Sequence, residues 1–294
     1  MRDARAQYKK EKRSHFEERT KEVLSELPTT QAKAAKRAAE YKNGQWLNMK
    51  CSAANGTILS RREWRDGWAV RYGKEPKDLP AQCDAPACRK PYSIDHALNC
   101  KHGGLVIRRH NEVRDELGLL CKLGYTHVGK EPIIKAGDPT KPHDDEDREG
   151  RRGDLVVRGA IASQTDCVID IKVINQNANS RSSTSTAAIL SGGEREKIKK
   201  HSQACQDRRA DFVPFVVTTD GCIGDQGQKF LRRLGKRLAE KWGKAYSEVA
   251  GLLFSRMSIA IVRAVSMCIR ATRNPVQCHR WCMDDGAALD LMLE

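Results

Sequence analysis

Three charged residues in the middle of the chain have the types and spacing of a metal-dependent hydrolytic site. Asp154 opens the apolar string DLVVR, and Asp170 and Lys172 lie two residues apart in the string CVIDIKVI. Side chains two residues apart on a strand point to the same face, so Asp170 and Lys172 are expected to point the same way. If the two strings pair as a hairpin, Asp154 comes close to Asp170, and two carboxylates and an amine converge.

Phosphodiester hydrolysis needs groups of these kinds. Carboxylate oxygens suit Mg²⁺ or Mn²⁺, which polarise a phosphoryl oxygen and make a bound water more nucleophilic. The Lys172 amine is suited to orient or deprotonate that water and to stabilise developing charge. Two further acids are candidates to complete the metal shell: Glu112 on an expected helix, and Glu131 at the end of an expected strand. The plainer alternative is the wet face of a half-exposed sheet, because an isolated D-x-K pair is common.

A second set of residues has metal-ligand spacing. Cys83, Cys88, His96 and Cys100 offer four soft ligands within a short segment, and His102 is a spare. Thiolate and imidazole ligands suit tetrahedral Zn²⁺, and four protein ligands make a closed structural site. The alternative is a set of ordinary thiols on a loop-rich segment, since eleven cysteines are spread through the chain. The spacing favours structural zinc.

The charge balance indicates a phosphate-rich partner. Lys and Arg number 53 against 38 Asp and Glu, which gives a formal charge of +15. Such a surface releases counterions when it neutralises phosphates, although a solvated basic surface is the plainer alternative. Aromatic residues make up only 5% of the chain, which does not favour a single-strand binder built on stacking platforms. The candidate nucleic-acid contacts lie on two expected helices and are Lys197, Lys199, Lys200, Arg232, Arg233 and Lys236.

The elements that must position these residues alternate between helices and strands. Hydrophobic periodicity predicts helices over 109–123, 194–209, 228–242 and 246–270, and strands over 126–134, 154–158, 167–174 and 212–218. This order is typical of an α/β domain in which helices flank a central mixed sheet. Pro214 predicts that the last strand lies at an edge or a bulge.

Four regions follow from composition along the chain. Residues 1–45 form a basic helical extension, and residues 46–104 a docking segment with the zinc knuckle. Residues 105–273 are expected to form the α/β domain, and residues 274–294 a C-terminal tail. The segments 135–152 and 180–186 are expected to be loops because they are polar and rich in Gly, Pro or Ser.

Neither a secretory signal nor a membrane span is expected. The first residues are polar and charged, without an apolar core. The longest apolar stretch, 249–269, contains Arg256 and Arg263, which argue against a transmembrane helix. We therefore expect an intracellular protein whose cysteines stay reduced.

The chain resembles a known family of nucleases. The arrangement of Asp154, Asp170 and Lys172, with an upstream helical acid, resembles PD-(D/E)XK, or restriction-endonuclease-like, phosphodiesterases. More narrowly, residues 46–273 resemble the endonuclease region found C-terminal to retrotransposon reverse transcriptases, through the strings NGTILSRREWRDGWAVRYG, SIDHALNCKHGGLVIRRHNEVRD, DFVPFVVTTDG and RLAEKWGKAYSEV. Proteins of that kind carry a similar Cys-Cys-His-Cys knuckle before the nuclease. The proline that names the family's first motif is absent, since Gly153 precedes Asp154.

The resemblance implies a restriction-endonuclease-like αβββαβ core, Mg²⁺ or Mn²⁺ dependence, structural zinc and cleavage of DNA in the nucleus. It implies that Asp154 and Asp170 are the two strand acids, Lys172 the motif lysine and Glu112 the helical acid. It also implies a reverse-transcriptase region encoded upstream, so that the chain is either a fragment or a freestanding derivative. The alternative function, from a different class, is a non-catalytic zinc-containing nucleic-acid-binding module that has lost cleavage.

Overall fold

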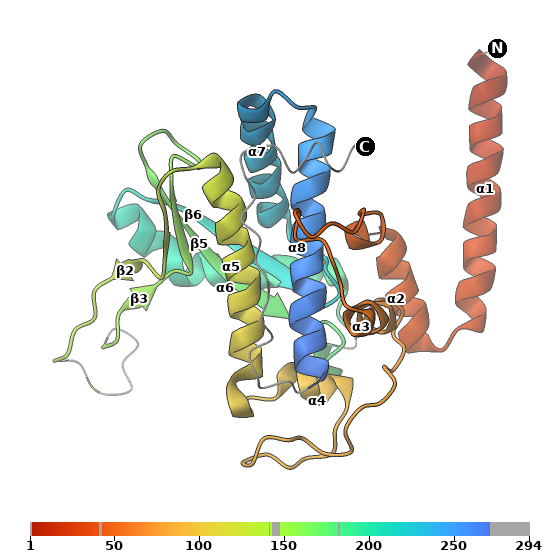
Figure 1. Cartoon of the computed structure of the whole chain (residues 1–294), viewed down its shortest axis with the longest axis horizontal. Coiled ribbons are helices and arrows are strands. Elements are labelled where there is room, and N and C mark those ends of the chain that lie inside the picture. The colour runs from red at the N-terminus through yellow and green to blue at the C-terminus, as the bar shows by residue number, and fades with distance from the viewer. Residues whose placement is uncertain (1, 41–42, 141, 143–147, 182, 271–294) are drawn as a thin grey trace.

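A four-stranded mixed sheet lies at the centre of the molecule in the computed structural model, which describes residues 2–40, 43–140, 142, 148–181 and 183–270 (Figure 1). The strand order is β1-β4-β5-β6; neighbours pair antiparallel except β5 and β6, which pair parallel. The strands are β1 (Val128–Lys130), β4 (Leu155–Arg158), β5 (Asp166–Ile174) and β6 (Asp211–Thr218). The predicted hairpin of β4 and β5 is confirmed, and β6, which contains Pro214, is an edge strand as expected.

Helices cover both faces of this sheet, which confirms the expected mixed α/β class. On one face, α5 (Leu105–Gly124), α7 (Asp225–Trp242) and α8 (Tyr246–Ile269) bury a large apolar cluster. The alternating residues of β5 that point into it include Ile169 and Ile171, both almost fully buried. The other face is covered by α6 (Thr186–Asp207), against which Val168 and Ile174 of β5 lie in smaller clusters. Side chains of β5 at even positions, including Asp170, therefore face α6.

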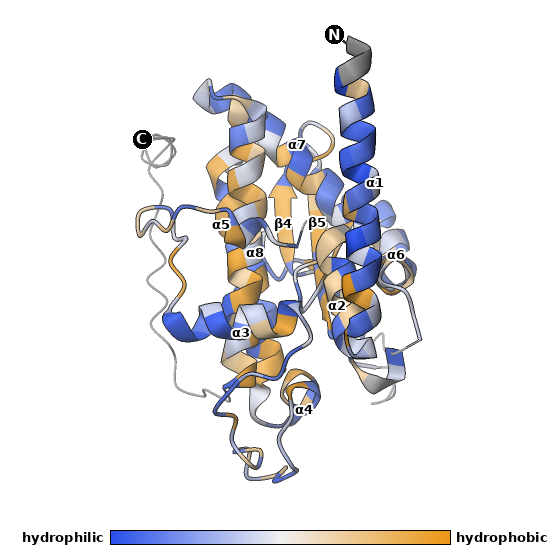
Figure 2. Cartoon of the chain, turned by 90° about the vertical axis from the view of Figure 1, so that its right-hand side faces the viewer, coloured by the Kyte–Doolittle hydropathy of each residue, from blue (hydrophilic) through white to orange (hydrophobic). Residues whose placement is uncertain are grey.

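The N-terminal region consists of one long helix, α1, and several shorter helices beside this body. They are α1 (Arg2–Glu26), α2 (Thr29–Glu40), η1 (Gln45–Leu47), α3 (Arg61–Arg71), α4 (Ile94–Asn99) and η2 (His102–Gly104). A break at Pro28 separates α1 from α2. Helix α1 is mostly hydrophilic and projects away from the rest of the chain, whereas α8 is largely apolar (Figures 1 and 2).

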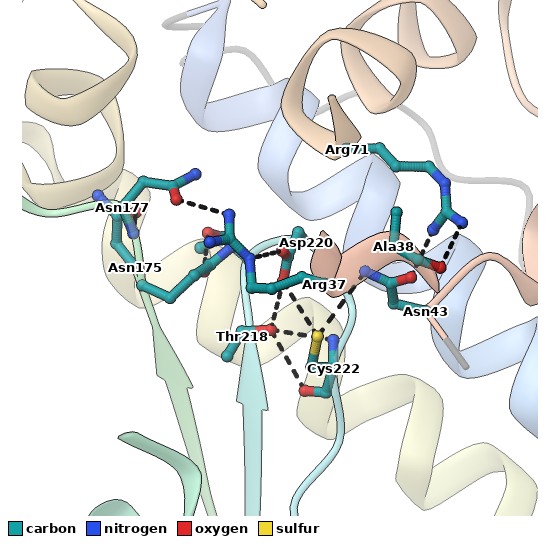
Figure 3. A network of polar contacts seen from close by, with 11 residues as sticks. Arg37, Ala38, Asn43, Arg71, Asn175, Asn177, Thr218, Asp220 and Cys222 are labelled. Atoms are coloured by element: carbon teal, nitrogen blue, oxygen red, sulfur yellow. Dashed lines mark hydrogen bonds and ion pairs between the residues drawn. The ribbon is translucent and has the colours of Figure 1, made fainter. Parts of the chain in front are cut away.

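A polar network joins α2 to the ends of the parallel strands (Figure 3). Arg37 Nε donates to Asp220 Oδ2 at 2.9 Å, and its Nη2 donates to Asn177 Oδ1 at 2.7 Å. The Asp220 side chain is fully buried and also accepts from Thr218 Oγ1 at 2.6 Å. Because a buried carboxylate is costly unless it is paired, these contacts hold α2 against the α/β body.

Two predicted elements have different boundaries. Helix α6 begins at Thr186 rather than at 194, because Ser185 caps it by accepting from the Ala188 amide. The strand predicted over 126–134, ending near Glu131 and Pro132, is divided into two short strands. It is interrupted at Glu131, which has φ 51°, and at Pro132, which lacks an amide donor, so β1 ends before them. The chain then forms β2 (Ile133–Lys135), which pairs with β3 (Arg151–Arg152) in a separate two-stranded sheet.

Helix α8 has the length and apolar composition of a membrane-crossing helix, but 83% of its apolar window is buried inside the protein. Its two arginines have partners within the fold. Arg256 Nε donates to Glu116 Oε1 at 2.6 Å, and Arg263 Nη2 donates to the Gly56 carbonyl at 3.0 Å. These features are those of a core helix. The expected tail, residues 274–294, lies outside the described residues.

Candidate active site and metal centre

The register of β4 and β5 brings the two predicted aspartates together. Leu155 pairs with Ile169, so Asp154 stands opposite Asp170, and the Asp154 amide donates to the Ile169 carbonyl at 3.0 Å. Residues directly opposite each other on antiparallel strands have side chains on the same face. The two carboxyl groups are close enough to interact directly.

The Asp154 carboxylate is held by one strand amide and one helical histidine. Its Oδ2 accepts from the Ile171 amide at 2.5 Å and lies 3.2 Å from His110 Nε2. The same His110 Nε2 lies 3.2 Å from the Ile171 carbonyl oxygen. Burial raises the pKa of Asp154, but the His110 contact and the Ile171 amide outweigh it, so that the pKa lies below its usual value. Burial lowers the pKa of His110, but Asp154 outweighs that effect and raises it.

The Asp170 carboxylate is more deeply buried and is compensated by a lysine from α6. Only 7% of its side chain is exposed, and Lys197 Nζ lies 2.6 Å from its Oδ2. Burial raises the pKa of Asp170 to about 6; the Lys197 charge opposes this and the Asp154 charge adds to it. His201 Nε2 lies 3.5 Å from the same oxygen, and burial, with Lys197, Lys200 and Arg151 nearby, lowers its pKa to about 4. His201 is therefore neutral at pH 7.

Lys172 lies on the same face of β5 as Asp170, but its ammonium points to a different acid. It forms an ion pair with Glu196 of α6, and a quarter of its side chain remains exposed. The Lys172 contact lowers the pKa of Glu196. Two adjacent residues of α6 therefore pair with β5: Lys197 with Asp170, and Glu196 with Lys172.

The two additional acids proposed as metal ligands, Glu131 and Glu112, lie at different positions relative to Asp154. Glu131 lies next to Asp154 across the sheet, since its amide donates to the Asp154 carbonyl at 3.0 Å. Its carboxylate accepts from Arg114 Nη1 at 2.8 Å and is 58% exposed. Glu112 lies two residues from His110, roughly 200° around α5, and so on a different face from the side chain that contacts Asp154. His110 of α5 contacts the carboxylate pair through Asp154.

The predicted nucleic-acid contacts fall into two groups. Lys199 and Lys200 are exposed on α6, the helix that also carries Lys197, and therefore lie on the same side of the sheet as Asp170. On α7, Lys236 is exposed and Arg232 Nη2 donates to Gln228 Oε1 at 2.8 Å. Arg233 Nη1 donates to the Ile161 carbonyl, in the β4–β5 turn and hence at the other end of the hairpin from Asp154. The α7 residues therefore do not adjoin the carboxylate pair.

The Cys/His cluster converges as predicted. The ligand atoms of Cys83, Cys88, His96 and Cys100 all lie within 4.8 Å of one another, so these side chains could hold a metal such as zinc. The Cys83 and Cys100 sulfurs are 3.9 Å apart, and Cys88 Sγ lies 3.5 Å from His96 Nε2. Over the described ranges, this is the only group of three or more Cys, His, Asp or Glu side chains that converges in this way.

Local backbone structure positions these four side chains. The amide of Cys83 donates to the Lys90 carbonyl at 2.9 Å, which closes the loop that carries the first two ligands. Ser93 caps α4 by accepting from the His96 amide, and Cys100 ends the same helix. Tyr92 Oη then donates to the Cys268 carbonyl at 2.8 Å, near the end of α8. A bound metal would therefore join the loop and α4 to each other and, through Tyr92, to the core helix.

No protein-family model and no curated protein matches the chain. The chemistry available to it is therefore judged from the two clusters. The carboxylate pair, next to amines and an imidazole, suits a hard cation and an anionic ligand, whereas the Cys/His cluster suits a soft or borderline metal. His110 and Glu196 were missed in the sequence because nothing in their local spacing marks them; both act through contacts between distant elements.

Proposed function

We propose that the chain is a metal-dependent endonuclease of the PD-(D/E)XK kind, acting on DNA and related to the endonuclease region of retrotransposons. The observation that carries the proposal is the pair Asp154 and Asp170, opposite each other on adjacent strands, with Lys172 on the same face. The element order α5-β1-β4-β5-α6-β6 is consistent with the αβββαβ core that the sequence resemblance implies.

The oxygens at this site fit Mg²⁺ or Mn²⁺. Asp154, Asp170 and the Ile171 carbonyl would hold the ion, and the shell would include several waters because Mg²⁺ retains them. The donor set supports this fit: Asp154 stands opposite Asp170, and Asp154 Oδ2 and the Ile171 carbonyl oxygen both lie 3.2 Å from one atom, His110 Nε2. When bound, such an ion supplies charge neutralisation and activation of water.

The protein's own residues have separate tasks in this proposal. His110 and the Ile171 amide keep Asp154 ionised and oriented, because both stabilise its charged form. Lys172 orients the attacking water or holds a phosphate oxygen, once the exposed Glu196 releases it. The exposed Lys199 and Lys200 on α6 hold the nucleic-acid backbone beside the site.

One observation favours the alternative, a nucleic-acid-binding module that no longer cleaves. Both amines at the site are already paired, Lys197 with Asp170 and Lys172 with Glu196. A cation that competes for Asp170 must displace the Lys197 ammonium. The two functions therefore differ in whether added Mg²⁺ gains access to the carboxylates.

Nicking of supercoiled plasmid by the full chain tests the proposal. With Mg²⁺ present, we expect nicking by the unmodified protein and at least roughly 100-fold less by Asp170→Asn, because the variant loses a charged ligand. The matched control is Asp166→Asn, which changes an exposed aspartate at the start of the same strand.

Plasmid binding, measured by gel shift, separates the two functions. The endonuclease proposal expects binding to persist in Asp170→Asn while nicking is lost. Binding without nicking in the unmodified protein, with either Mg²⁺ or Mn²⁺, would overturn the proposal and favour the non-catalytic module. Equal loss of nicking in both aspartate variants would indicate a general effect of charge on β5.

A further inference from the structure

A cavity of about 1070 Å³ lies between α2, α3 and the segment 74–80, and its lining contains no residue of the carboxylate pair or of the Cys/His cluster. One of its walls is a single face of α3. Trp64, Trp68 and Tyr72 follow one another at four-residue spacing, so their rings form a stripe along that helix.

These rings are fixed in place and yet remain accessible. Trp68 stacks on Tyr72 with ring centroids 4.8 Å apart and an interplanar angle of 23°. Trp64 makes an edge contact, also at 4.8 Å, with the buried Trp46. Trp68 is 40% exposed and Trp64 is 37% exposed. Large aromatic surfaces held in one orientation at the wall of a cavity are suited to stack on a flat ligand.

The cavity is also positively charged. Its acids are Asp66, Glu75 and Asp78, whereas its cations are Arg61, Arg62, Arg65, Lys74, Lys77 and Arg270. The Asp66 carboxylate is already occupied, because it accepts from Ser266 Oγ at 2.6 Å and forms an ion pair with Arg270. In the part of the chain that the structure describes, Arg61, Arg62 and Arg65 form no ion pair. Their guanidinium groups lie along the same helix as the exposed rings.

We propose that this cavity binds single-stranded nucleic acid. An unpaired base would stack on the Trp64 and Trp68 rings, and the adjoining phosphates would bind the arginines at the start of α3. A duplex does not fit this chemistry, since the faces of its bases are covered by their neighbours. The low aromatic content of the chain does not argue against such a platform, because Trp46, Trp64, Trp68 and Tyr72 are gathered at one place.

This second site is independent of the proposed cleavage. It involves no residue of the carboxylate pair and no metal, and α3 packs on α8 rather than on the strands that carry Asp154 and Asp170. Its failure and the failure of the endonuclease proposal are therefore measured separately. Asp170→Asn should bind a single strand as the unmodified protein does.

Fluorescence anisotropy of a labelled oligothymidylate, about 12 nucleotides long, tests the inference with the full chain and no added Mg²⁺. Trp68→Ala should weaken binding by roughly tenfold, because stacking on one ring is lost, and Trp68→Phe should retain most of the affinity. Tyr8→Ala removes an exposed aromatic ring from α1 and is the matched control, with affinity unchanged. Arg62→Ala should reduce the slope of log affinity against log salt by roughly 0.7, the value for one phosphate contact on a single strand.

Either of two results would overturn the inference. One is equal affinity of Trp68→Ala and the unmodified protein for the oligonucleotide. The other is full competition by a duplex of the same length at the same concentration. Trp68→Phe and the exposed Arg62→Ala keep the test valid if Trp68→Ala is misfolded, because neither substitution removes packing from the interior.

Discussion

The two metal-type clusters of this protein are assembled in opposite ways. The Cys/His cluster takes all of its ligands from residues 83–100, and one loop and one short helix bring them together. The carboxylate pair takes its residues from β4 and β5, and its charge partners from α5 and α6. The first cluster needs correct local backbone structure, whereas the second also needs correct strand register and helix packing.

The chemistry of the two clusters differs in the same way. The Cys/His ligands converge on one another, and a bound metal would supply the missing positive charge. The carboxylates are instead compensated by the protein itself, through His110 and Lys197. A locally encoded cluster is therefore expected to depend on its metal for stability, while an assembled one is expected to tolerate the absence of metal.

The largest effect is expected for loss of a cysteine ligand. Cys88→Ser should reduce bound zinc from about one ion per chain to almost none. It should lower the thermal midpoint by roughly 10 °C, since loss of a structural metal costs on the order of 4 kcal/mol. Zinc content by mass spectrometry and calorimetry measure these effects. Cys51→Ser, at an exposed free cysteine, is the control, and unchanged zinc in Cys88→Ser would show that the cluster is not a metal site.

Substitution of Lys172 tests the site formed by the carboxylate pair. Lys172→Met should reduce plasmid nicking by about 100-fold, or ~2.7 kcal/mol of transition-state stabilisation, because a cation near the reacting phosphate is lost. Stability should change little, since the partner Glu196 is 64% exposed. Lys229→Met, at an exposed ion pair with Asp225 on α7, is the matched control. Undiminished nicking by Lys172→Met would remove Lys172 from the proposed mechanism.

The same contrast explains how much the sequence could predict. Ligand spacing was enough to predict the convergence of Cys83, Cys88, His96 and Cys100, because they lie close together along the chain. Strand alternation was enough to predict the hairpin and the shared face of Asp170 and Lys172. These inferences use regular local geometry, which the sequence pattern carries directly.

The charge partners could not be predicted in this way. Whether His110 or Glu112 approaches Asp154 depends on how α5 is rotated against the sheet, and both lie on the same helical segment. Lys197 was expected to contact phosphate, but in the packing of α6 its ammonium forms an ion pair with Asp170. Such contacts depend on helix rotation and translation of a few ångströms, which hydrophobic periodicity does not specify.

The raised pKa of Asp170 predicts a pH-dependent stability difference. Its carboxyl has a pKa of about 6 in the folded chain and 3.8 as the ordinary value, so the folded state binds more protons between these values. Stability contributed by this group therefore falls as pH rises. Between pH 5 and 7.5, without divalent metal, the unmodified protein should lose about 1.4 kcal/mol relative to Asp170→Asn. Urea unfolding at both values measures the difference; a constant difference would show that Asp170 is not held in this environment.

The smallest expected effect comes from a substitution that disturbs the packing of α6 on the sheet. This packing positions both Lys197 and Glu196. A side chain at Gly193 would meet Ile174 Cδ1 and Val216 Cγ1, each at 3.0 Å, so the helix lies directly on the sheet at this residue. Gly193→Ala should lower the free energy of unfolding by about 1 kcal/mol, since crowding outweighs the helix-propensity gain. It should also reduce nicking, because Lys197 lies one turn further along.

Gly192→Ala is the neighbouring control, since nothing lies within 4 Å of its added Cβ. It should stabilise the protein by about 1 kcal/mol through helix propensity alone and leave nicking unchanged. Opposite signs for two adjacent glycines would show that close packing of α6 against β5 and β6 fixes the carboxylate site. Equal stabilisation by both substitutions would mean that α6 can move away from the sheet without an energetic cost. The contacts of Lys197 and Glu196 would then not depend on close packing of α6 against β5 and β6.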